Sequence, residues 1–188
     1  MGFRFDADAH LYYYQGVIVP HITELLDRGG WIDDTWYTEE SSERGVQVHR
    51  LTADYDLGAI DVASCRSAYR GYLLSHVKAF SIMRPKILAV EEPAVHPELR
   101  FGGRPDRELL AYDLHAVLEG KSGDPTRAHQ IQTALQAILL APRAHLPAEA
   151  LARFALYWKG SGKFKLEEHR DVRRDFAEAR RLIHKYCV

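Results

Sequence analysis

The sequence predicts an α/β protein, because stretches with helical spacing of apolar residues alternate with short runs typical of β-strands. Residues 64–83 keep the helical spacing over several turns. Two apolar runs, 109–112 and 116–118, flank a few polar residues and predict a β-hairpin. A second pair of strand-like runs flanks the turn Gly160-Ser161-Gly162. At 188 residues we expect one domain, residues 1–188, with a sizeable core.

The composition is that of an ordinary globular protein, with 46% hydrophobic and 27% charged residues. The formal net charge is −1, so no global basic field indicates nucleic acid, although a local basic groove would suffice. The sequence shows no apolar run long enough to span a bilayer and no signal-peptide pattern at its first residues. We therefore expect a cytoplasmic protein with no membrane partner.

The N-terminal part of the chain predicts a small β-structure followed by helices. Two or three short strands joined by tight turns are expected at residues 3–5, 11–14 and 17–19. A helix is expected from Pro20 to the glycines at 29–30, and another from Glu39 to Tyr55. Ser64 is expected to cap a long helix that ends near Met83.

The central and C-terminal parts predict strands and two more helices. A strand over residues 86–90 is expected to continue to residue 95, with an edge or bulge at Pro93. Asp124 and Pro125 form an N-cap followed by proline, which predicts a helix to Leu140 that Ala141-Pro142 ends. Strands over 154–159 and 163–167 follow. Asp171 is expected to cap a last helix to Tyr186.

The stretch from Gly103 to Lys121 is where the sequence predicts chemistry. Residues i and i+2 of a strand point to the same face, so Glu119 and Lys121 emerge side by side. A fold-back of the chain after Asp106 can place Asp106 opposite Glu119 on an antiparallel strand. Two carboxylates suit Mg²⁺ or Mn²⁺, which can activate a water and stabilise a phosphodiester under attack, with Lys121 handling that water. The alternative is an ordinary cross-strand ion pair.

The order of these residues resembles the core of the PD-(D/E)XK nuclease superfamily, in its RecB/Cas4-like and phage-type exonuclease branch. The resemblance rests on Gly103-Arg104-Pro105-Asp106, a hairpin, and Glu119-Gly120-Lys121. Some relatives carry a four-cysteine iron–sulfur site, which Cys65 and Cys187 cannot build.

Three further residues match the family's motifs in the same order. His49, shortly after Gly45 on a helix, resembles the metal-ligating histidine of the first motif, and Glu92 resembles a glutamate that serves a second metal. Gln132 resembles the glutamine of a Gln-x-x-x-Tyr motif, but Gln136 stands at the tyrosine position, which puts in doubt any DNA contact of that tyrosine. Each match has an ordinary alternative: a packed histidine, a solvated glutamate beside a Glu91 that faces elsewhere, and an exposed glutamine.

The resemblance implies a restriction-endonuclease-like core, that is, a mixed central sheet flanked by helices, with an N-terminal β-hairpin. It implies a deoxyribonuclease dependent on one or two Mg²⁺ or Mn²⁺ ions, most like a phage or prophage exonuclease of DNA recombination or repair that works beside a single-strand annealing protein. The implied metal ligands are His49, Asp106 and Glu119, with Glu92 for a second ion. DNA would meet Arg104, Gln132 and the helix start at Thr126 and Arg127.

Two other functions stay open at this point. A catalytically inactive module with the nuclease fold would bind nucleic acid or a partner protein. A hydrolase of small phosphate esters would use the same residues. Exonuclease or endonuclease action, polarity and oligomeric state have no signature in the sequence.

Overall fold

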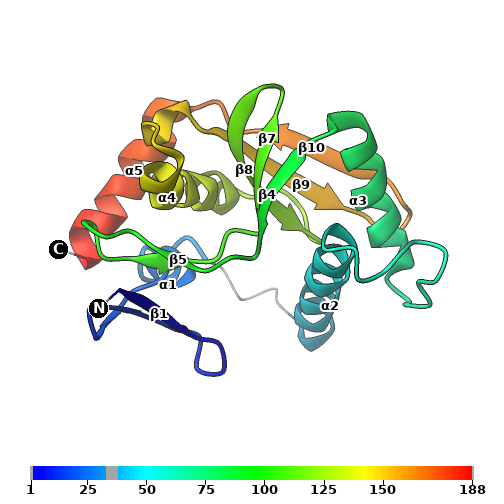
Figure 1. Cartoon of the computed structure of the whole chain (residues 1–188), viewed down its shortest axis with the longest axis horizontal. Coiled ribbons are helices and arrows are strands. Elements are labelled where there is room, and N and C mark those ends of the chain that lie inside the picture. Colours follow the sequence, from blue (N-terminus) through cyan, green and yellow to red (C-terminus); the bar gives the residue numbers. More distant parts are fainter. Residues whose placement is uncertain (1, 33–37, 188) are drawn as a thin grey trace.

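The computed structural model describes residues 2–32 and 38–187. Its fold is α/β, with a mixed five-stranded sheet in the order β10-β9-β8-β7-β4 (Figure 1). The strands of this sheet are β4 (Lys86–Val90), β7 (Arg107–Ala111), β8 (Leu114–Lys121), β9 (Ala152–Trp158) and β10 (Phe164–Glu168). Neighbouring strands are antiparallel except β8 and β9, which are parallel. A parallel pair needs a long crossover, and helix α4 (Arg127–Ala144) supplies it.

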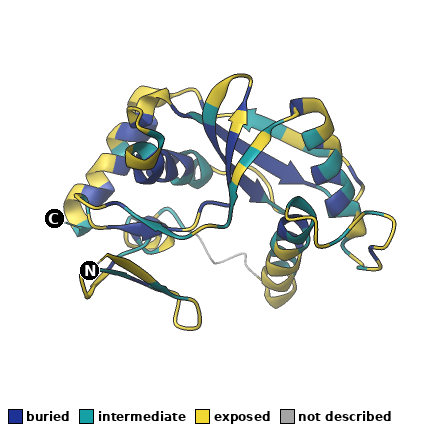
Figure 2. Ribbon diagram, in the orientation of Figure 1, coloured by how far each residue is buried: buried dark blue, intermediate teal, exposed yellow. Residues whose placement is uncertain are grey.

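Helices cover both faces of the sheet (Figure 1). On one face α4 packs with α1 (Ile22–Arg28) and α5 (Val172–Tyr186), and on the other lie α2 (Glu39–Asp56) and α3 (Arg70–Met83). The side chains of β8 alternate between these layers, because Val117 belongs to the core cluster of α4 whereas Leu118 belongs to that of α2 and α3. Figure 2 shows the central strands buried between the two layers.

A separate three-stranded antiparallel sheet forms the N-terminus, as the sequence predicts. Its strands are β1 (Phe3–Asp6), β2 (Leu11–Tyr14) and β3 (Val17–Val19). Two short elements, β5 (Ala94–Val95) and β6 (Gly102–Gly103), form an additional antiparallel pair, and η1 (Ala148–Ala150) is a 3₁₀ turn. A bridge between His21 and Gly102 joins the N-terminal sheet to the segment that leads into β7.

Several predicted boundaries are confirmed, and four are wrong. The Glu39 helix and the Asp171 cap are present, and the Asp171 carboxylate accepts the Arg174 N–H at 3.1 Å. Ser64 does not cap α3, because its N–H is held in a turn by the Asp61 carboxylate at 2.6 Å and the helix begins only at Arg70.

Helix α4 is shifted relative to the prediction, and β4 is shorter. The N-cap of α4 is Thr126 and not Asp124, and the helix continues through Pro142 to Ala144. Pro142 has no N–H to donate to the Ile138 carbonyl, so the helix continues through it with one hydrogen bond fewer. Strand β4 ends at Val90, since Glu91 has a left-handed backbone with φ of 47°. Within the described ranges, no helix combines the length and apolarity that crossing a bilayer requires.

Candidate metal centre

The predicted meeting of Asp106 and Glu119 is confirmed. Strand β7 pairs with β8 so that Arg107 lies opposite Leu118, which places Asp106 opposite Glu119 at the next position. The backbone N–H of Gly120 donates to Asp106 Oδ2 at 2.7 Å. Both carboxylates are buried, with 8% of Asp106 and 3% of Glu119 exposed. The short hairpin therefore brings two acidic groups together where little of either is exposed to solvent.

Gly120 faces the opposite side of β8 and lies against Trp158. A Cβ atom at position 120 would lie 1.9 Å from Trp158 Cη2, so only glycine fits this position. The Trp158 ring in turn lies edge-on to the ring of His49, with 5.3 Å between centroids. The absence of a side chain between Glu119 and Lys121 thus leaves room for the aromatic ring that supports His49.

We expect Gly120→Ala to lower the free energy of unfolding by about 3 kcal/mol, because the Trp158 ring has to move out of a packed core. Urea titration followed by tryptophan fluorescence measures this change. Gly123→Ala is the matched control, since a Cβ there meets nothing within 4 Å. Equal stability of the two variants would show that Trp158 has room to shift.

His49 reaches Asp106 from the other layer of the molecule. Its Nδ1 lies 3.2 Å from Asp106 Oδ1, so the two oxygens of this carboxylate have different partners. His49 is carried by α2, whereas Asp106 precedes a strand of the sheet. The centre is therefore assembled by tertiary packing and not by one local motif.

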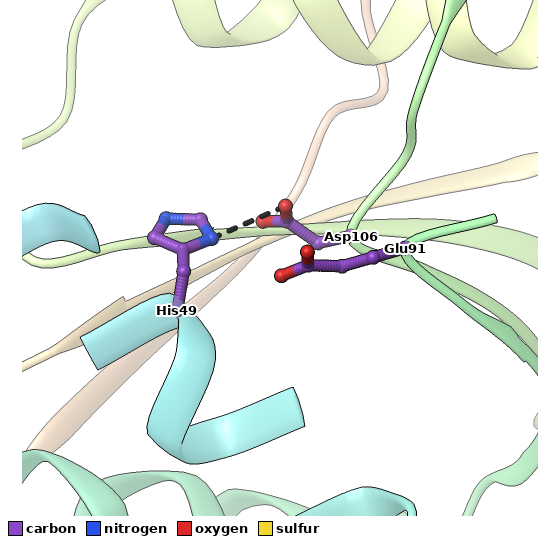
Figure 3. Close-up of side chains that lie close together, drawn as sticks. All are labelled: His49, Glu91 and Asp106. Carbon is purple, nitrogen blue, oxygen red and sulfur yellow. Dashed lines mark ion pairs between the residues drawn. The ribbon is translucent and has the colours of Figure 1, made fainter. Parts of the chain in front are cut away.

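Glu91 joins this pair, contrary to the expectation that it faces elsewhere. One ligand atom each from His49, Glu91 and Asp106 lies within 4.8 Å of the others (Figure 3). The Glu91 N–H donates to the Asp106 carbonyl at 3.0 Å, and its positive φ turns the side chain toward Asp106. Strand alternation cannot predict this, because alternation ends where the strand ends.

Glu92, predicted to serve a second metal, lies outside the cluster. Its carboxylate pairs with Arg143 at 3.2 Å, and 57% of its side chain is exposed. Glu91 is consequently the glutamate of this segment that we assign to the centre. Arg104 lies beside it, with 3.6 Å between Arg104 Nη2 and Glu91 Oε2.

Glu119 is held by three donors. Lys121 Nζ and Gln132 Nε2 each lie 2.7 Å from its Oε1, and Gln136 Nε2 lies 2.5 Å from its Oε2. Gln132 is therefore not an ordinary exposed glutamine. The contact of Gln136 was missed by the sequence analysis, although its position one helical turn after Gln132 is a signal that it faces the same way.

The electrostatics reflect two carboxylates in one buried site. Burial, and then the charge of Asp106, raise the pKa of Glu119 against the opposing charges of Lys121 and His49. Burial would raise the pKa of Asp106 as well, but the charge and hydrogen bond of His49 outweigh it and lower that pKa to about 2. Burial lowers the pKa of His49, yet Asp106 more than offsets this and the net change is upward. A divalent cation would neutralise this concentration of negative charge.

Some of the residues predicted to contact DNA lie at the centre and one does not. Arg127 is turned away, because its guanidinium pairs with the buried Asp175 at 2.6 Å, and Asp175 also accepts from Arg153. Sequence reasoning could not foresee this partner, which lies 48 positions later in the chain. Thr126 and Arg104 do line the cleft above the centre.

That cleft has a volume of about 1250 Å³ and runs from the metal centre along α2 toward the N-terminal sheet. Its floor includes His49, Asp106 and Glu119. The basic side chains along it are Arg44, Arg50, Arg104 and Lys121. The same cleft is also lined by the carboxylates of Asp54, Glu91, Asp106, Glu119 and Asp124, so charges of both signs line it and it is not a basic groove.

The donor set fits a divalent cation. One imidazole nitrogen with two carboxylate oxygens suits Mn²⁺, which accepts both donor types, and Mg²⁺ would rely more on the oxygens. Glu119 does not belong to this group of three, and its two oxygens accept hydrogen bonds from Lys121, Gln132 and Gln136. His49, Glu91 and Asp106 are thus the residues whose ligand atoms lie close enough together to hold one ion.

Comparisons with known proteins name no family for this chain. No protein-family model matches it, and no curated protein matches its sequence. The assignment of function consequently depends on the donor groups at the metal centre and on the cleft that leads to them.

Proposed function

We propose that this protein is a metal-dependent nuclease that hydrolyses phosphodiester bonds of DNA. The observation that carries the proposal is the pairing of two buried carboxylates, Asp106 and Glu119, across a hairpin, with the Lys121 ammonium 2.7 Å from one of them. On this proposal the five-stranded sheet is the restriction-endonuclease-like core of a PD-(D/E)XK enzyme of the RecB and phage-exonuclease branch.

The chain's own residues divide the work as follows. Asp106, Glu119, His49 and Glu91 would hold Mn²⁺ or Mg²⁺, which when bound stabilises charge that develops on a phosphodiester. Lys121 would orient the attacking water, because its ammonium is fixed beside Glu119 at the edge of the cleft. To accept the proton of that water it would first have to lose one of its own to solvent and act as the neutral amine. Arg104 binds a phosphate of the substrate, since 40% of its side chain is exposed above Glu91.

DNA is favoured over a small ester by the length of the cleft, which extends well beyond the carboxylates along α2. A small phosphate ester would leave most of that volume unused. An exonuclease role in recombination or repair, beside a strand-annealing protein, follows from the resemblance and belongs to the same proposal.

One observation favours the alternative of an inactive nuclease-fold module. Both oxygens of Glu119 accept hydrogen bonds within the protein, one of them from Gln136 at the position of the family's tyrosine. A centre that keeps these contacts permanently would bind DNA or a partner without cleaving it.

The decisive experiment compares end-labelled linear duplex, linear single strand and closed circular DNA, each with Mn²⁺, Mg²⁺ or EDTA. We expect metal-dependent degradation of linear DNA that Glu119→Gln abolishes. Asp113→Asn, an exposed residue at the tip of the β7–β8 hairpin, is the control and should retain full activity. Cleavage of the circle as well would indicate an endonuclease.

Two results would redirect the assignment. Folded protein that cleaves none of the substrates with either metal would favour the inactive module. Turnover of a chromogenic phosphodiester at a rate above that of any DNA would favour a small-ester hydrolase.

A further inference from the structure

Gln136 differs from the other polar residues of the centre in how completely it is enclosed. It lies on α4 with 2% of its surface exposed, among the apolar residues that pack this helix against the sheet. Its Nε2 donates to Glu119 Oε2 at 2.5 Å. Because the surrounding side chains are apolar, the hydrogen bond to Glu119 determines the orientation of the Gln136 amide.

The three contacts to Glu119 are not equivalent. Lys121 and Gln132 share Oε1, whereas among the described residues only Gln136 is seen to donate to Oε2. Without Gln136 the carboxylate would be held at one oxygen and free to rotate about it. With Gln136 both oxygens are fixed, and the plane of the carboxylate is set.

The other end of the same amide points to a ligand. Gln136 Oε1 is buried and has no hydrogen-bond partner among the described residues, and Gln136 lines the cleft. Buried acceptors are satisfied as a rule, by protein or by ordered water. Because Oε1 is closed off from the cleft, the hydrogen bond that it lacks must come from a water enclosed beside Glu119 and not from solvent in the cleft.

We propose that Gln136 is a positioning residue of the metal centre, whose Nε2 fixes Glu119 Oε2 while its Oε1 accepts a hydrogen bond from an enclosed water. This inference rests on the proposed role of Glu119 as a metal ligand. It gives Gln136 a function in metal binding, where the family resemblance leaves its position without a role. Groups that orient metal ligands commonly change metal affinity by 10- to 100-fold when they are removed.

The first test measures the contact itself and needs no activity. Gln136→Glu places two carboxylates against each other, and we expect its melting temperature to fall. Adding Glu119→Gln to that variant reverses donor and acceptor, and we expect it to recover part of the loss. If the change in stability of the double variant equals the sum of the changes in the two single variants, the proposed contact between residues 119 and 136 is wrong.

The second test measures Mn²⁺ binding by titration calorimetry. We expect Gln136→Leu to raise the dissociation constant about tenfold. Gln47→Leu, at an exposed position of α2, is the matched control and should bind as the wild type does.

The outcomes separate this inference from the proposed function. Wild-type Mn²⁺ binding that Glu119→Gln removes and Gln136→Leu leaves unchanged would overturn the role of Gln136 alone. Wild-type protein that binds no Mn²⁺ would overturn the proposed function and this inference together. A tenfold weakening in Gln136→Leu with a folded protein supports both.

Discussion

Lys121→Ala is expected to slow DNA cleavage by about a thousandfold while leaving the fold intact. The Lys121 ammonium lies 2.7 Å from Glu119 Oε1 and borders the cleft, so it is placed to act on a water that attacks a bound phosphodiester. Its removal does not strand the Glu119 carboxylate, because Gln132 and Gln136 still donate to it. The affinity for Mn²⁺ should not fall, because the substitution removes the Lys121 ammonium, whose positive charge repels a cation bound nearby.

Single-turnover rates with saturating Mn²⁺ measure this effect without interference from product release. Lys159→Ala is the control, because Lys159 is a lysine near the same strand ends that forms a solvent-exposed ion pair with Asp124. Cleavage by Lys121→Ala at the wild-type rate would show that the catalytic group has been assigned to the wrong residue.

Asp56→Ala is expected to lower the free energy of unfolding by about 3 to 5 kcal/mol. The Asp56 carboxylate accepts from Arg107 Nε at 2.5 Å and contacts His76 Nε2 at 2.8 Å, and all three side chains are almost fully buried. Alanine would leave the Arg107 guanidinium in the interior without its counter-charge. Because Arg107 also donates to the Asp106 carbonyl, the metal centre should be disturbed as well.

Urea unfolding monitored by circular dichroism measures this loss. Asp54→Ala, two positions earlier on α2, removes only an exposed pairing with Arg50 and should change stability by less than about 0.5 kcal/mol. A loss for Asp56→Ala as small as that of the control would mean that water reaches Arg107 and replaces the carboxylate.

Local patterns in the sequence were sufficient for most of the secondary structure. The spacing of apolar residues predicts α2 and α5, and the capping role of Asp171 follows from its side chain alone. The start of α3 could not be predicted from Ser64, because Ser64 forms a turn in which its N–H donates to the Asp61 carboxylate. The extension of α4 past Pro142 depends on packing that no local signal describes.

The predicted part of the metal centre is the part that depends on strand geometry. Asp106 and Glu119 meet because a short hairpin has little freedom in its register, and Lys121 follows by alternation. Glu91 was missed, and Glu92 predicted in its place, because one residue with positive φ reverses the side to which a side chain points. Only the three-dimensional structure shows that the Arg127 guanidinium is already paired with the Asp175 carboxylate.

His49 approaches Asp106 from helix α2, whereas Glu119 faces it from the neighbouring strand β8, and this has a consequence for local stability. Helix α2 contributes few buried residues to the core, chiefly Val48, Thr52 and Ala53. An ion shared by His49 and Asp106 would add a second link between α2 and the sheet, beside the buried pair of Asp56 and Arg107. Its binding energy would then resist the detachment of α2, so that occupancy of the centre and closure of the cleft wall become one equilibrium.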